Sequence, residues 1–211
     1  MDLIRKLVLG CVVAIAALAL GGVGAAAAEQ SVLCKANETP CAAGNRYASG
    51  TEFVLKSKGA IKWATNAEGL KYEVSCTGAE FKGKTTTAGG SSEPVEVSFS
   101  SQFLSGCNCS FATLQLAKMK FNWASGTMNA SVTTTGLEYS FTCETALGQV
   151  TCAYGGEIKE GTTMTGGSPA VLAYKEAPVA KTSGSFLCGT QAKLSVEFEV
   201  AAPKPLYVAN A

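Results

Sequence analysis

Alternation of apolar and polar residues with a period of two is the feature that most constrains this chain. The segment 194–200 reads Leu-Ser-Val-Glu-Phe-Glu-Val, so its apolar side chains share one face and Glu197 and Glu199 share the other. Such alternation is typical of strands that bury one face. The same pattern occurs at 51–56, 70–76, 95–99, 137–143, and at 114–116 continued by 119–123.

Glycine-rich segments separate these stretches and are interpreted as turns or loops: 89–92, 155–156 and 166–169. No segment after residue 28 shows a helical period. Short strands with regular turns predict an all-β fold, either an antiparallel sandwich or a barrel.

The first 28 residues predict a secretory signal peptide, with an N-terminal signal helix. A short charged start is followed by an uncharged apolar run over 7–23 and by the small residues Ala26 and Ala28, which fit cleavage after Ala28. The alternative is an uncleaved membrane anchor, although the run is near the lower limit for spanning a bilayer. Cys11 lies near the start of the apolar run and is interpreted as part of the signal. The mature chain is therefore expected to be secreted or held in the cell envelope.

Eight of the nine cysteines follow the signal, and an even number in an exported chain predicts a disulfide framework. A zinc site would favour paired C-x-x-C motifs, and the only close pair is too tightly spaced for one. The sequence therefore predicts four disulfides and no metal. The candidates are Cys34, Cys41, Cys76, Cys107, Cys109, Cys143, Cys152 and Cys188.

A weak internal repeat divides the mature chain. Residues 80–90 and 157–167 share the pattern E-φ-K-x-x-T-T-x-x-G-G, and each copy follows a Val-Ser-Cys or Val-Thr-Cys triplet. The repeat predicts an N-terminal disulfide loop segment (29–49) and two similar β units (50–123 and 124–211). The units could be two domains or two halves of one sandwich, and the lack of a linker favours close packing.

Two disulfide schemes remain open, since connectivity does not follow from sequence alone. Cys34 and Cys41 bracket a short loop and are paired first in both. Cys143 and Cys152 could then staple a hairpin. The repeat instead suggests three other bridges: Cys76–Cys107, Cys152–Cys188 and Cys109–Cys143.

The absence of histidine, together with Asp2 as the only aspartate, excludes most familiar catalytic groups. Ser-His-Asp triads, aspartic dyads and histidine-based zinc sites cannot be built. Glutamate pairs remain: Glu197 with Glu199, and Glu93 with Glu96. We interpret the first pair as the solvated side of a strand. No catalytic residue and no cofactor is predicted.

Charge also limits the partners. Once Asp2, Arg5 and Lys6 leave with the signal, positive and negative residues balance, and no basic stripe stands out. Nucleic acid is therefore not expected as a partner, and membrane contact is expected only through an uncleaved signal. Among the aromatic residues that could stack on sugars, Tyr72 and Tyr139 are predicted to be core, while Trp123 is predicted to be partly exposed. The others are Trp63, Tyr154 and Tyr174.

The segments 33–41, 45–47, 50–51, 166–170, 186–188 and 203–208 together resemble a group of uncharacterised secreted bacterial proteins with a Cys-containing all-β mature region. The resemblance implies export and a common fold, and it implies no activity.

The expected function is therefore that of a non-enzymatic secreted or cell-envelope protein, structural or ligand-binding, with a cell-envelope component or a glycan as a possible partner. One alternative is a carbohydrate-active enzyme, which would need two glutamates about 5–10 Å apart. Another is a secreted protease inhibitor presenting a disulfide-tied loop such as 35–40.

Overall fold

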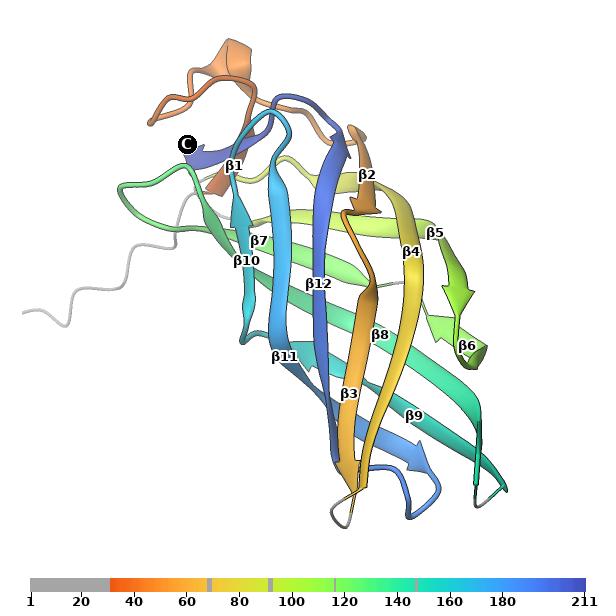
Figure 1. The fold of residues 1–211 in the computed structure, drawn as a ribbon. Coiled ribbons are helices and arrows are strands. Elements are labelled where there is room, and N and C mark those ends of the chain that lie inside the picture. Colours follow the sequence, from red (N-terminus) through yellow and green to blue (C-terminus); the bar gives the residue numbers. More distant parts are fainter. Residues whose placement is uncertain (1–30, 68–69, 91–92, 116, 147) are drawn as a thin grey trace, which may run out of the picture.

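A computed structural model describes residues 31–67, 70–90, 93–115, 117–146 and 148–211 (Figure 1). This part of the chain is built of strands, with one short 3-10 turn at Ala43–Asn45, so the predicted all-β fold is confirmed. The signal peptide, its helix and Cys11 lie outside the described residues. Within the described part, no helix has the length and apolar character needed to cross a bilayer.

The strands are β1 (Ser31–Cys34), β2 (Glu52–Ser57), β3 (Ile61–Ala67), β4 (Leu70–Thr87), β5 (Val95–Cys107), β6 (Ser110–Gln115), β7 (Lys118–Trp123), β8 (Ala130–Thr145), β9 (Gly148–Ile158), β10 (Thr162–Thr165), β11 (Val171–Gly184), β12 (Gln191–Ala202) and β13 (Tyr207–Asn210).

One antiparallel sheet closes on itself. From β11 it runs through β12, β2, β4, β5, β7, β8 and β9, and β9 pairs again with β11. Strands β2 and β3 occupy one position in succession, because both pair with β4 on one side and with β12 on the other. A single closed sheet, rather than two separate sheets, therefore encloses the core.

The closed sheet is flattened into two layers. In Figure 1, β3, β4, β10, β11 and β12 run roughly parallel in front, and β5, β7, β8 and β9 cross behind them at a large angle. Large side chains from both layers fill the space between, and Phe53, Phe121, Tyr139, Tyr154 and Leu172 are all buried.

A second, two-stranded sheet of β1 and β13 lies at one end of the closed sheet. It has its own small buried cluster of Val32, Cys34, Cys41 and Ala209. The Ser31 hydroxyl accepts a hydrogen bond from the Trp123 backbone N–H at 2.7 Å, which ties this sheet to β7.

Four disulfides are present, and the Cys34–Cys41 bridge agrees with expectation. The other three follow the scheme that the repeat suggested: Cys76–Cys107, Cys109–Cys143 and Cys152–Cys188. The alternative hairpin bridge does not form, because Cys143 lies opposite Val150 and Cys152 lies opposite Phe141. The repeat itself stays a prediction, although segments 50–123 and 124–211 share the closed sheet through β7 and β8.

Two local expectations were wrong. Gly155 and Gly156 lie within β9 and make no turn. A Cβ at Gly155 would stand 2.7 Å from the Leu137 carbonyl oxygen, and Gly156 has φ +111°, so these glycines allow β9 to bend. The stretch 114–123 is not one strand, because it divides into β6 and β7, which both pair with β8.

Candidate functional site

The interior of the closed sheet is a packed core rather than a ligand chamber. It contains a cavity of about 40 Å³ whose surface is entirely apolar and whose lining includes Leu55, Phe81, Phe198 and Leu194. That volume holds only a few water-sized groups, whereas pockets for organic ligands usually measure about 300–1,000 Å³. This cavity is therefore too small for an organic ligand.

Three buried tyrosines near this cavity differ in the hydrogen bonds that their hydroxyl groups make. The Tyr154 hydroxyl donates to Thr65 Oγ1 (3.1 Å) or the Gly189 carbonyl (3.2 Å), and the Tyr174 hydroxyl is 2.7 Å from Thr134 Oγ1. Among the described residues, the Tyr139 hydroxyl has no hydrogen-bond partner. Burial raises the pKa of Tyr139 well above its usual value of 10, so this side chain is a neutral core residue.

A hollow of about 530 Å³ lies on the outside, where β4, β3 and β12 run side by side. Its floor is at Ala64, which pairs in register with Glu73 on β4 and with Lys193 on β12. The hollow forms because a small side chain on the central strand is flanked by two long ones. The lining is Ala64, Thr65, Asn66, Lys71, Tyr72, Glu73, Thr190, Gln191 and Lys193.

Tyr72 is among the residues that line this hollow, but its side chain projects from the opposite face of β4 to those of Lys71 and Glu73, because successive strand residues alternate. It was expected to be core, because it shares a strand face with Val74 and Cys76, but it is only half-buried. It lies opposite Thr65, one step along the ladder beyond the buried pair of Trp63 and Val74. The β3–β4 hairpin therefore extends past the core, and Tyr72 remains accessible. Exposed amides of Asn66 and Gln191 stand in the same hollow.

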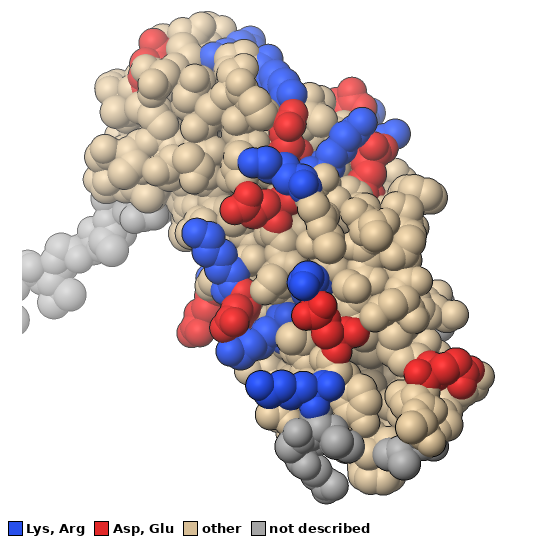
Figure 2. Space-filling model, viewed as in Figure 1, with Lys and Arg blue, Asp and Glu red and all other residues tan. Residues whose placement is uncertain are grey.

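Two of the three charged residues in the hollow already have ion partners. Glu73 is 3.1 Å from Lys62, and Lys193 is 2.9 Å from Glu176. Within the described part of the chain, Lys71 has no ion pair. Basic and acidic side chains are interspersed through the middle of this face (Figure 2).

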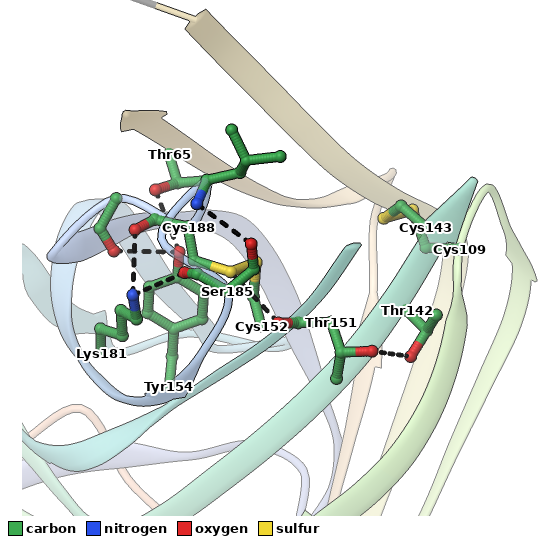
Figure 3. The surroundings of a disulfide bond; sticks show 12 residues. Thr65, Cys109, Thr142, Cys143, Thr151, Cys152, Tyr154, Lys181, Ser185 and Cys188 are labelled. Atoms are coloured by element: carbon green, nitrogen blue, oxygen red, sulfur yellow. Dashed lines mark hydrogen bonds between the residues drawn. A yellow bond between two sulfur atoms is a disulfide. The ribbon is translucent and has the colours of Figure 1, made fainter. Parts of the chain in front are cut away.

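A rigid turn forms one border of the hollow (Figure 3). The Cys152–Cys188 disulfide holds its end, and the Lys181 ammonium donates to the carbonyls of Ser185 (2.7 Å) and Cys188 (3.3 Å). The Ser185 N–H donates to the Thr151 carbonyl at 3.0 Å. Gly189 follows, packed so closely that a Cβ there would lie 2.4 Å from the Asn66 carbonyl oxygen. The chain then enters the hollow at Thr190 and Gln191.

Phe186 is at the tip of this turn and is 76% exposed. The Cys188 N–H donates to the Ser185 carbonyl at 3.0 Å, so the backbone around Phe186 is a closed turn. The loop 35–40, considered for an inhibitor, is bridged by Cys34–Cys41, and Glu38 accepts hydrogen bonds from the Ala42 N–H and the Asn45 amide. These two bonds lower the pKa of Glu38.

The candidate glutamate pairs lie outside the hollow, and three of the four residues have their own lysine partners. Glu197 pairs with Lys58, and Glu199 pairs with Lys204. Glu96 pairs with Lys118, and Glu93 is exposed.

A shallower hollow of about 380 Å³ brings Glu176 and Glu197 together. A hydrogen bond from Lys193 lowers the pKa of Glu176, whereas a general acid in a glycosidase needs a raised pKa. The one cluster of three possible metal ligands in the described residues is Cys34, Glu38 and Cys41, and its two sulfurs form the disulfide.

The remaining aromatic candidates contribute to the core or to local structure. Trp63 and Tyr139 are buried with ring centres 5.3 Å apart, as expected for Tyr139. Trp123 is partly exposed, as expected, and its indole N–H donates to the Thr127 carbonyl at 2.7 Å. Of the six aromatic candidates, Tyr72 is the one that lines the hollow.

Comparison of the chain with protein families, with curated proteins and with solved structures gave no match.

Proposed function

We propose that this chain is an exported, non-enzymatic β-sheet protein that binds a carbohydrate chain in the hollow between β4, β3 and β12. The observation that carries the proposal is the pair of exposed amides, Asn66 and Gln191, which line the hollow together with the charged side chains of Lys71 and Glu73. A sugar presents a rim of hydroxyls that both donate and accept hydrogen bonds. Amides and charged side chains suit such a rim, because an amide also does both.

The size and rigidity of the hollow support the same proposal. Its volume of about 530 Å³ falls within the usual range for small-molecule sites. The disulfide and the Lys181 hydrogen bonds hold the turn before Thr190, so this border is ordered before a ligand arrives. A preformed site loses less conformational entropy on binding.

The proposed location outside the cytoplasm is supported by the four disulfides, which persist in oxidising compartments. Intact-mass analysis of the native protein tests it. The expected result is a chain that begins at Glu29 with all eight remaining cysteines oxidised. Free thiols in the native material would contradict the location.

A glycan array probed with the purified mature protein tests the binding. We expect Gln191→Ala to weaken the interaction about fivefold, the scale of one lost hydrogen bond. The matched control is Gln149→Ala, which removes another exposed glutamine, on β9 and outside the hollow. Equal binding by both variants, or no binding to any glycan by the parent protein, would refute the proposal.

A further inference from the structure

We infer that the hollow is one half of a longer groove, and that this groove takes a linear, uncharged oligosaccharide lying along β3 and β12. The other half is the shallower hollow of about 380 Å³. This inference rests on the proposed function, because it specifies the class of carbohydrate that the same site takes.

The two hollows lie next to each other on the outer face of the sheet. On β3, Ala64 lines the hollow and Lys62 lines the shallower one; on β12, Lys193 lines the hollow and Ser195 lines the shallower one. Side chains two residues apart on a strand share a face, and β3 and β12 are paired neighbours (Figure 1). Residues 191–197 of β12 therefore border one groove, which is about 20 Å long at a rise of 3.3 Å per residue.

Two ion pairs leave the centre of this groove clear where the hollows meet. Lys62 reaches Glu73 on β4 at 3.1 Å, and Lys193 reaches Glu176 on β11 at 2.9 Å. Strands β4 and β11 lie on opposite sides of the β3–β12 pair, so the two lysine side chains lean away from each other. The small side chain of Ala64 remains at the floor between them. A chain-like ligand can therefore extend from one hollow into the other.

A β-bulge in β11 forms the wall of the shallower hollow. The register with β12 shifts between Tyr174 and Ala177, and Glu176 has φ +49°, which is uncommon for a residue other than glycine. The bulge places Lys175 and Glu176 on the outside, between two buried residues. The Glu176 N–H donates to the Ser195 hydroxyl at 3.2 Å, which holds the bulge against β12. The fold therefore forms this half of the groove before a ligand arrives.

The charges inside the groove indicate an uncharged ligand. Glu73, Glu176 and Glu197 line it, and each has a lysine ion partner at 2.9–3.8 Å. An anionic chain would bring its charges close to these carboxylates, and a cationic chain would bring its charges close to the partner lysines. Sugar hydroxyls can donate to the carboxylates and accept from the ammonium groups without displacing either partner.

The test is titration calorimetry of the full mature protein with neutral oligosaccharides of two lengths. The probes are the dimers and hexamers of three linear series, the cello-, malto- and chito-oligosaccharides, which cover different linkages and substituents. Hexagalacturonate serves as the anionic chain of the same length.

We expect at least one neutral hexamer to bind about tenfold more tightly than its dimer, because the shallower hollow adds one or two hydrogen bonds. The same hexamer should bind more tightly than hexagalacturonate. Ala60→Tyr should lower its affinity to that of the dimer, because exposed Ala60 lines the shallower hollow and a tyrosine there would obstruct it. The matched control is Ala48→Tyr, which enlarges an exposed alanine before β2, outside both hollows, and should keep the tenfold difference.

A second measurement needs no variant. A saturating concentration of the hexamer should shift the backbone amide NMR signals of both Gln191 and Glu197, which lie in the two halves of the groove. A shift confined to Gln191 would show that the ligand occupies the hollow alone, and it would overturn the inference.

Three results of the calorimetry would also overturn the inference and leave carbohydrate binding intact: equal affinity for hexamers and dimers, an equal loss in both alanine variants, or tightest binding by hexagalacturonate. If no probe binds, the inference fails and the glycan array tests the proposed function separately. Binding of a branched or charged glycan on the array would retain the proposed function, and a blank array would refute it.

Discussion

The two faces of β3 lead to two different kinds of surface. The inward side chains, Ile61 and Trp63, are buried beside an apolar cavity of about 40 Å³. The outward residue Ala64 forms the floor of a polar hollow of about 530 Å³. One strand thus separates a region that stabilises the fold from a region suited to recognition. Since the two regions share a backbone and few side chains, substitutions should affect stability and binding separately.

The largest expected effect on stability comes from a substitution in the core. Phe198 is buried and packs against Phe81 and Tyr174, with ring centres 5.5 and 6.3 Å away. Phe198→Ala should lower the free energy of unfolding by about 3–5 kcal/mol, because it removes apolar burial and leaves a cavity. Urea denaturation measures the loss. Glycan binding at a temperature where the variant is still folded should match the parent, and weakened binding there would break the comparison.

The second prediction concerns the Cys152–Cys188 disulfide, which stabilises the fold and also anchors the turn beside the hollow. Replacing both cysteines by alanine opens a loop with a sequence separation of 36 and should cost about 4 kcal/mol. It should also weaken glycan binding, since the turn that borders Thr190 and Gln191 loses its anchor.

The control for that experiment is the Cys34–Cys41 bridge, which has a sequence separation of 7 and lies in the small sheet region. Its double alanine variant should cost about 2.5 kcal/mol by the same chain-entropy estimate and leave binding unchanged. Equal binding losses in the two variants would indicate that the turn has no specific role in the hollow.

A smaller effect on stability should distinguish two stacked tyrosines of the core. Tyr139 and Tyr154 lie opposite each other on β8 and β9, with ring centres 5.8 Å apart. Tyr154→Phe should lose about 1–2 kcal/mol, because it removes bonds to Thr65 and Gly189. Tyr139→Phe should be neutral or stabilising, since it removes a buried hydroxyl without a partner in the described structure. Thermal denaturation compares them, and a larger loss for Tyr139→Phe would contradict the assignment.

The smallest effect lies on the charged face. Lys82 and Lys56 lower the pKa of Glu80, chiefly through the hydrogen bond from Lys82. Because the folded pKa is below the unfolded value, the stabilisation is present above about pH 4.5 and is lost as pH falls through the folded pKa. Glu80→Gln should therefore reduce the melting temperature slightly at pH 7 and not at pH 3. A difference that persists at pH 3 would argue against this ion-pair origin.

The strands could be predicted from the local alternation of apolar and polar residues. Strand β12 is the clearest case, because its buried residues alternate with more exposed ones along nearly its whole length. Strand β3 was not predicted. Its inward residue Thr65 is polar and its outward residue Ala64 is apolar, which breaks the period-two pattern. Thr65 is buried because Gln191 and Tyr154 lie within hydrogen-bonding distance in the fold, and neither contact is visible in the local sequence.

The hollow could not be derived from sequence, because it depends on long-range register. Residues 64, 73 and 193 meet only once β3, β4 and β12 are aligned. Tyr72 illustrates the same limit. Its alternation with Val74 and Cys76 gives the correct face, but the sequence does not show where along the strand that face leaves the core. The disulfides were easier to predict, since the pairing of Cys76 with Cys107 and of Cys152 with Cys188, which the repeat suggested, was correct.

The closure of the sheet has a consequence for how copies of this protein behave when crowded together. Strands β4, β11 and β12 each have a hydrogen-bonded neighbour on both sides, so their backbone amides and carbonyls are already occupied. A sheet with little open edge offers little template on which another chain can add a strand, and aggregation by that route is suppressed. A carbohydrate polymer that bound many copies along its length would therefore bring them close together without promoting aggregation through strand pairing.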